Sequence, residues 1–191
     1  AFDISFLNAV PNMVLFAPRC EESMKNVMEF AYSYKGVSAF RYPRGAFILR
    51  DEFKAKKLEF GKGEILADAK SDIAFLGYGN GVGKANLVRN LLADKLEAIL
   101  VDLVFVKPLD SELLLDLAKR TKKWYIFSDS AKKGGVGEIV SAFLQENGIS
   151  NVSVVSFEYD DKFIQHGSTA EVEKSLGISA GQITQKLLEN N

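Results

Sequence analysis

Short apolar runs alternate with amphipathic stretches along most of the chain. Four six-residue runs are rich in Val, Ile, Phe and Tyr, as is typical of strands buried on both faces of a sheet: 72–77, 98–103, 124–129 and 152–157. Three other stretches carry apolar residues at the spacing of a helix: 84–94, 110–121 and 136–147. This alternation predicts an α/β fold of three layers (α/β/α), with helices on both faces of a mostly parallel sheet.

Polar residues and glycines mark the ends of the predicted helices. Asp110 stands where an N-cap is expected, and Gly148 follows its helical stretch as a helix-ending glycine does. Residues 168–171 and 179–182 both place Ser three residues before Glu or Gln, which is the spacing of a capping box. We therefore expect two further short helices in the tail, separated by Gly177.

The first part of the chain predicts a single β-α-β unit. Residues 13–17 and 38–42 have the composition of short strands, and residues 21–34 between them have the apolar spacing of a helix. One such unit cannot cover both faces of a parallel sheet. We expect its sheet to be completed by residues outside this chain, or the unit to pack on a partner.

A charged stretch at 46–63 separates this unit from the rest. Its lysines alternate with acidic residues, which favours a solvated linker over a binding patch. The predicted division is a partial β-α-β unit at 1–45, the linker, and a main domain at 64–191. The chain begins Ala-Phe-Asp-Ile, with no initiator Met and no signal-peptide pattern, so we expect it to be the C-terminal part of a longer protein.

The composition excludes several classes of protein. Lys+Arg is 24 and Asp+Glu is 25, and this net charge of −1 argues against a nucleic-acid partner. The apolar runs are far shorter than the roughly 20 residues of a membrane span, so no membrane partner is expected. One cysteine, Cys20, fits a reducing cytosol and hence a cytoplasmic protein. With His166 as the one histidine, we expect neither a His/Cys metal site nor a Ser-His-Asp triad.

Two glycine-rich stretches precede predicted helices. The stretch at 77–84 has the wrong spacing for a dinucleotide fingerprint or a P-loop, so a tight strand-to-helix turn is favoured over nucleotide binding. The stretch at 134–137 could hold an anion on free backbone N–H groups, or could allow close packing against a neighbouring subunit. The packing interpretation is favoured.

The segment Arg-Tyr-Pro-Arg-Gly at 41–45 is the most informative local stretch. It follows a predicted strand, at the sheet edge where ligands bind in open α/β sheets. The guanidinium groups of Arg41 and Arg44 could grip a phosphate through paired hydrogen bonds. From the local residues alone, a surface arginine pair remains the favoured interpretation. For His166, a structural or interface role is favoured over a catalytic one, because no orienting carboxylate is adjacent in sequence.

Several collinear stretches resemble the 1-deoxy-D-xylulose-5-phosphate synthase family. The combination of Arg-Tyr-Pro-Arg-Gly with Phe-Val-Lys-Pro-Leu-Asp distinguishes this family from the related transketolases and pyruvate dehydrogenase β subunits. In place of the family's usual Glu-Glu-Asn, this chain has Ser-Asp-Ser at 128–130, which puts any role of that turn in doubt. The matching stretches are 2–7, 11–14, 17–18, 39–45, 61–64, 101–110, 134–137 and 163–168.

The resemblance implies a homodimeric thiamine diphosphate and Mg²⁺ enzyme that joins pyruvate to D-glyceraldehyde 3-phosphate, making a precursor for isoprenoid, thiamine and pyridoxal synthesis. It implies that residues 1–45 end a pyrimidine-binding domain and that 64–191 form a transketolase-like C-terminal domain. Arg44 then contacts the acceptor phosphate, and Arg41 is a weaker substrate-binding candidate that could instead face the core or a domain interface. The catalytic, cofactor and metal residues of the family lie upstream, so we expect this fragment alone to bind no cofactor and to be inactive.

Two alternatives stay open at this point. One is the β subunit of a 2-oxo-acid dehydrogenase, which would co-purify with a separate α chain. The other is a non-catalytic α/β module whose role is dimerisation. A cofactor-binding motif in upstream sequence would favour the enzyme over the module.

Overall fold

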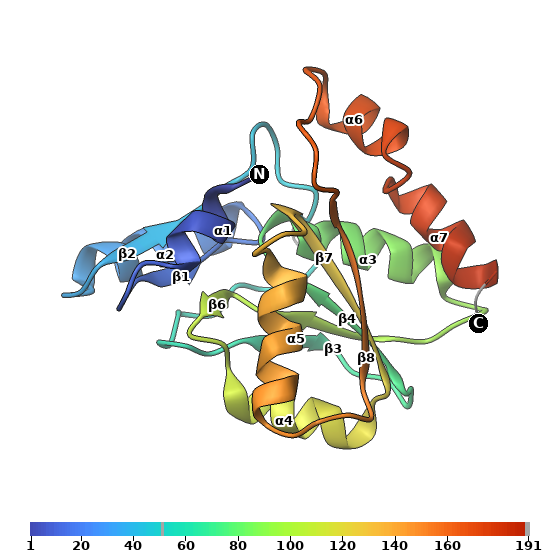
Figure 1. The fold of residues 1–191 in the computed structure, drawn as a ribbon, viewed down its shortest axis with the longest axis horizontal. Coiled ribbons are helices and arrows are strands. Elements are labelled where there is room, and N and C mark those ends of the chain that lie inside the picture. Colours follow the sequence, from blue (N-terminus) through green and yellow to red (C-terminus); the bar gives the residue numbers. More distant parts are fainter. Residues whose placement is uncertain (51, 190–191) are drawn as a thin grey trace.

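A computed structural model describes residues 1–50 and 52–189, and this part of the chain forms two sheets with helices packed around them (Figure 1). The larger sheet has the strand order β3-β5-β4-β7-β8, and the smaller has the order β2-β1-β6. The strands are β1 (Val14–Phe16), β2 (Ser38–Phe40), β3 (Glu64–Ala67), β4 (Ile73–Gly77), β5 (Ile99–Asp102), β6 (Phe105–Lys107), β7 (Lys123–Ala131) and β8 (Ser153–Tyr159). The helices are α1 (Asp3–Asn8), α2 (Glu21–Ser33), α3 (Asn80–Leu92), α4 (Ser111–Arg120), α5 (Val136–Glu146), α6 (Thr169–Ser175) and α7 (Ala180–Glu189).

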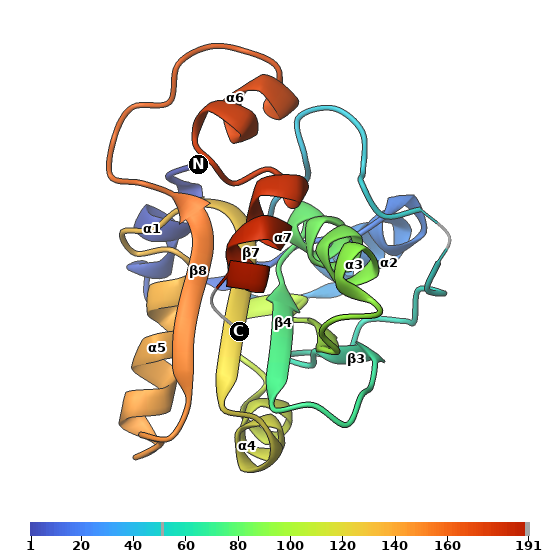
Figure 2. The same ribbon diagram turned by 90° about the vertical axis from the view of Figure 1, so that its right-hand side faces the viewer.

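The larger sheet confirms the predicted α/β class and its mostly parallel strands. Strands β5, β4, β7 and β8 run parallel, and only the edge strand β3 is antiparallel to its neighbour β5. Alternate residues of β4 enter different cores: Ala74 and Leu76 pack with α4 and α5, whereas Ile73 and Phe75 pack with α3 and α7. In Figure 2, α3 and α7 lie in front of the sheet and α5 lies at its other side. The predicted three layers are therefore present.

The smaller sheet begins as the predicted β-α-β unit. Strands β1 and β2 are parallel and α2 connects them. The third strand, β6, comes from the second half of the same chain and pairs antiparallel with β1. The sequence pattern indicated only residues outside the chain or a partner as sources of further strands. Phe16 and Phe105, whose ring centroids are 5.3 Å apart, help to form the small core beneath this sheet.

The predicted helix ends are largely confirmed. The carboxylate of Asp110 accepts a hydrogen bond from the Leu113 N–H, and Gly148 takes a positive φ of 68° after α5. Ser168 and Glu171 form the predicted capping box at α6. The helix expected from residue 84 begins earlier, at Asn80, because the glycine-rich turn is itself helical. A Cβ on Gly81 would overlap the carbonyl oxygen of Phe127 on β7, so this glycine permits close packing of helix on sheet.

Among the described residues, no helix has both the length and the apolar character needed to cross a membrane.

Candidate functional site

The Arg-Tyr-Pro-Arg-Gly segment follows the carboxyl end of β2, as the sequence predicts. The backbone N–H of Arg41 still bonds to Phe16 on β1, which fixes the start of the segment to the sheet. Gly45 has a φ of 106°, a conformation that residues with a side chain rarely adopt. The segment therefore leaves the sheet at a fixed point and turns at a position that requires glycine.

Arg41 is held between two carboxylates. Its Nε lies 3.0 Å from Asp3 Oδ2 on α1, and its Nη1 lies 2.8 Å from Asp129 Oδ1 on β7. Its side chain is only 17% exposed. Arg41 thus ties the arginine segment to the main domain, in line with the expectation that it could face a domain interface.

Arg44 differs in both respects, because it is exposed and has no hydrogen bond or ion pair with any other described residue. It lines a cavity of about 520 Å³ together with Arg41. Residues 163–167, in the loop that carries His166 between β8 and α6, also line this cavity. Two candidates that are far apart in the sequence therefore face the same cavity.

Buried and exposed aromatic residues shape this cavity. Tyr159 lies at the end of β8, where burial raises the pKa of its phenol to about 12. Phe163 is 92% exposed, and its ring meets Phe2 edge-on with centroids 6.2 Å apart. Tyr42 is also exposed. The cavity can therefore offer apolar surface on the same side as the free guanidinium of Arg44.

In the glycine-rich stretch before α5, backbone N–H groups donate hydrogen bonds to a carboxylate of the same chain. Glu158 on β8 accepts hydrogen bonds from the N–H groups of Val136 and Gly137 and from the hydroxyl of Ser130, at 2.7–3.0 Å. A Cβ on Gly137 would lie 2.7 Å from this carboxylate. Burial raises the pKa of Glu158 above its ordinary value, despite these hydrogen bonds. Within the chain, these glycines therefore allow close packing against β8, and packing against a neighbouring subunit stays a prediction.

The departure from the family pattern at 128–130 is part of this arrangement. The hydroxyls of Ser128 and Ser130 lie 2.8 Å apart, and Ser130 donates to Glu158. Asp129 between them points to Arg41. Residues 128–130 lie in β7 rather than in a turn, and this end of the strand links the N-terminus of α5 to the arginine segment.

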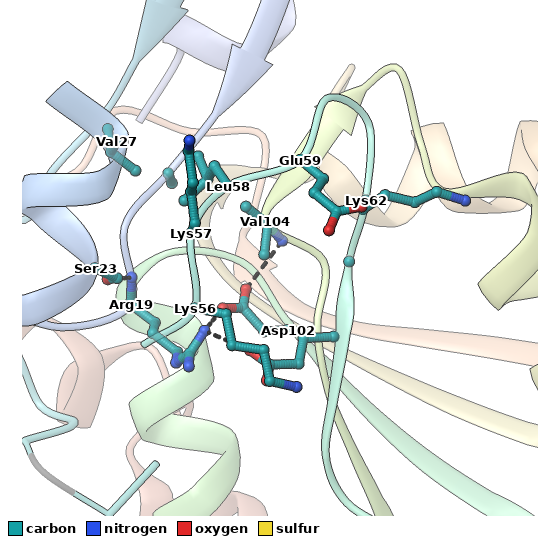
Figure 3. A pocket seen from close by; sticks show the side chains of 13 residues that line it. Arg19, Ser23, Val27, Lys56, Lys57, Leu58, Glu59, Lys62, Asp102 and Val104 are labelled. Atoms are coloured by element: carbon teal, nitrogen blue, oxygen red, sulfur yellow. Dashed lines mark hydrogen bonds and ion pairs between the residues drawn. The ribbon is translucent and has the colours of Figure 1, made fainter. Parts of the chain in front are cut away.

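A second cavity, of about 300 Å³, lies at the junction of the two sheets (Figure 3). Arg19 is at its base, and its Nη1 lies 3.0 Å from Asp102 on β5 and 3.1 Å from Glu64 on β3. Lys56 lies 2.7 Å from Glu64 at the edge of the cavity. The charges on these walls are therefore largely paired with each other.

Asp102 is the centre of this network. Burial raises the pKa of its carboxyl to about 6, against the opposing effects of Arg19 and of the Val104 N–H. Its Oδ1 accepts the Val104 N–H at 2.9 Å, which holds Val104 at a φ of 52°. A β-branched residue seldom occupies this left-handed region. Asp102 thus both pairs with Arg19 and fixes the turn between β5 and β6.

Sequence analysis missed the role of Arg19. The available signal was Asp102, a carboxylate inside an otherwise apolar run at 98–103. A buried carboxylate requires a cation or several hydrogen-bond donors, so its presence predicts a charged partner nearby. Nothing in the local pattern shows that this partner is Arg19.

The linker at 46–63 is fastened along α2. Arg19 donates to the carbonyl of Lys54, Glu22 accepts the N–H of Ala55, and Asn26 donates to the carbonyl of Lys56. Most of its side chains are exposed, as expected of a solvated linker, but Leu49 is fully buried. The linker is thus held against the domain at residues 54–56 and at Leu49.

The fold is that of a known family, since the transketolase C-terminal domain matches residues 61–183. The chain belongs to the transketolase C-terminal domain family. Its curated relatives include the 1-deoxy-D-xylulose-5-phosphate synthase of Campylobacter fetus subsp. fetus (strain 82-40), 57% identical over 96% of this chain. The enzyme of that name from Sulfurimonas denitrificans is 47% identical over 97% of it. These matches confirm the resemblance found in the sequence motifs.

This transketolase-family chain spans about 30% of the length of both relatives. Among solved structures, one titled "Split gene transketolase, inactive beta4 tetramer" has a TM-score of 0.84 and 24% identity, and covers 98% of this chain and 62% of its own. The transketolase of Campylobacter jejuni has a TM-score of 0.62 and 16% identity, over 98% of this chain and 28% of its own. At these identities the two structures support the fold alone.

Among residues 1–50 and 52–189, no three His, Cys, Asp or Glu side chains are grouped so that they could hold a metal ion. The residues that the structure describes therefore do not fit a Mg²⁺ site.

Proposed function

We propose that this chain is the C-terminal part of a 1-deoxy-D-xylulose-5-phosphate synthase, which condenses pyruvate with D-glyceraldehyde 3-phosphate to give 1-deoxy-D-xylulose 5-phosphate and CO₂. The support is identity of 47–57% to synthases of that name over nearly the whole chain. In this proposal residues 1–45 end the pyrimidine-binding domain, 46–63 are the linker, and 64–191 are the C-terminal domain.

The proposed parent enzyme is a homodimer that uses thiamine diphosphate and Mg²⁺. The cofactor supplies the carbanion chemistry when bound, and the protein supplies orientation and binding. We assign the cofactor-holding residues to other parts of the parent, so the 191-residue chain on its own is proposed to be inactive. Carboligation by a pure sample of this chain would contradict that assignment.

One observation carries the role proposed for this chain: Arg44 is exposed, unpaired among the described residues, and lines the 520 Å³ cavity. A guanidinium offers a planar fork of N–H donors that matches phosphate oxygens. Arg44 would grip the phosphate of the acceptor aldehyde and so hold its carbonyl in one orientation. Arg41 would act mainly by fixing the segment from which Arg44 extends.

Kinetics of the full-length enzyme test this role. Arg44→Ala removes charge-assisted hydrogen bonds, so we expect the KM for D-glyceraldehyde 3-phosphate to rise roughly 10- to 100-fold. The KM for pyruvate should change by less than about twofold, because pyruvate carries no phosphate.

Arg50→Ala provides a matched control, since Arg50 is also exposed but does not line this cavity. Unphosphorylated D-glyceraldehyde provides a second control, because Arg44→Ala should hardly change its use. Equal effects of Arg44→Ala on both substrates would contradict the assignment.

A further inference from the structure

We infer that the main domain supplies part of the acceptor-phosphate site, with His166 as a phosphate-binding side chain in the cavity that Arg44 also lines. This inference rests on the proposed function. It assigns the domain at 64–191 a direct part in substrate recognition, in addition to a role in assembly.

The first argument is placement. His166 is exposed, and it lines both the 520 Å³ cavity that Arg44 lines and a cavity of about 610 Å³ between its own loop and α6. Within the described part of the chain, neither side chain has a hydrogen bond or ion pair. Their donor groups are therefore free for a ligand in the cavity.

The second argument is that the His166 loop is fastened at both ends. Before it, Asp160 lies 2.6 Å from Lys132, next to the end of β7. After it, the capping box of Ser168 and Glu171 begins α6. In Figure 2 the loop arches past the N-terminal residue between these two points. A loop fixed in this way can hold its side chains within a restricted region, which for His166 includes the 520 Å³ cavity.

A buried ion pair then secures α6 to the domain. Lys84, only 4% exposed, pairs with Glu173 on α6. Lys84 is the last residue of the glycine-rich stretch, whose glycines bring α3 close to the sheet. The glycine-rich stretch at 77–84, which lacks the spacing of a nucleotide-binding motif, thus helps to position α6, the helix that follows His166.

The third argument is chemical complementarity. A phosphate dianion has three oxygens that accept hydrogen bonds in different directions. The guanidinium fork of Arg44 can satisfy two of them, and an imidazole N–H from His166 in the same lining can satisfy another. Asp129 in the cavity lining is already paired with Arg41, so its charge opposes an anion less. The geometry therefore favours a terminal phosphate over a neutral hydroxyl.

The test is steady-state kinetics of the full-length enzyme with His166→Ala. We expect the KM for D-glyceraldehyde 3-phosphate to rise roughly tenfold, while the values for D-glyceraldehyde and pyruvate stay within about twofold. His166→Gln keeps an N–H donor at similar reach and should recover part of the loss. Lys162→Ala is the matched control, since Lys162 is an exposed cation in the same loop that does not line this cavity.

Combining His166→Ala with Arg44→Ala sharpens the result. If both side chains bind one phosphate, the double variant should lose less than the two single losses combined. A loss of kcat that is equal for phosphorylated and unphosphorylated acceptors, or no rescue by glutamine, would indicate a structural role and overturn the inference.

The outcomes separate the inference from the proposed function. If Arg44→Ala discriminates against the phosphorylated acceptor and His166→Ala does not, the inference fails and the proposed function stands. If neither variant affects the phosphorylated acceptor selectively, the proposed phosphate site itself is wrong.

Discussion

Arg19 and Arg44 line two different cavities of the molecule, and these two arginines differ in their partners. Arg19 is buried, with Asp102 and Glu64 within 3.1 Å of its guanidinium. Arg44 is exposed and has no partner among the described residues. The first cation joins two parts of the fold, whereas the second is available to a ligand. Pairing, rather than residue type or the presence of a cavity, therefore distinguishes a structural arginine from a binding one.

The motif at 41–45 contains one paired arginine and one arginine without a partner among the described residues. Arg41 and Arg44 line the same cavity, but Arg41 is shared between Asp3 and Asp129. Two arginines of one five-residue motif are thus expected to have different roles. Three predictions test the comparison between Arg19 and Arg44, from the largest expected effect to the smallest.

Arg19→Met should destabilise the chain by about 3–5 kcal/mol, because it leaves Asp102 buried without its cation. Urea unfolding followed by tryptophan fluorescence measures this, since Trp124 is fully buried in the main domain. The double variant Arg19→Met with Asp102→Leu should recover much of the loss, because it removes both charges. If Arg19→Met lowered the unfolding free energy by less than about 1 kcal/mol, the Arg19–Asp102 pair would contribute no more than a surface ion pair, and the prediction would be wrong.

Asp102 should make stability depend on pH. Its folded pKa of about 6 lies above its ordinary value of 3.8, so the folded state binds the proton more tightly. Unfolding free energy should therefore fall as pH rises from about 4 to about 6, by up to about 3 kcal/mol from this group. In the Asp102→Asn variant, this contribution to the pH dependence of the unfolding free energy should be absent. Parallel pH profiles for the two proteins between pH 4 and 6 would contradict the prediction.

Arg44→Ala should change the unfolding free energy by less than about 0.5 kcal/mol, since no described partner is lost. The same urea experiment measures it, so Arg44 and Arg19 are compared directly. A loss of 2 kcal/mol or more, on the order of a buried hydrogen bond to a charged group, would mean that Arg44 supports the fold. The contrast between the two arginines would then disappear.

The parts of the fold that the sequence predicted are those with a strong local signal. A strand buried on both faces is a continuous apolar run, so β4, β5 and β7 could be located from composition alone. The run at 152–157 also located β8, but this edge strand is not buried on both faces, since Val155 is 47% exposed. Strand β6 could not, because it is three residues long and is defined by pairing with β1, far away in the sequence. Helix α1 was missed for a similar reason, since Ile4 is buried only because β-strands of the main domain lie beneath it.

The same distinction applies to the sites. Arg44 could be proposed because proline and glycine beside it indicate a fixed turn at a sheet edge. His166 gave no such indication, because its neighbours in sequence carry no partner group. Its place in the cavity that Arg44 lines results from the path of the loop after β8, which lines this cavity together with Ala1, Phe2 and the arginine segment. Such a placement depends on tertiary structure and is absent from any local pattern.

Strand β6 also constrains the order in which the chain can fold. The first 45 residues contribute only β1 and β2 to their sheet, and the third strand arrives at residues 105–107. More than half of these 191 residues must therefore be synthesised before β6 can pair with β1. For the same reason, a protease that cuts within 46–63 should nick the chain without releasing its N-terminal piece, because backbone hydrogen bonds between β1 and β6 still join the two fragments.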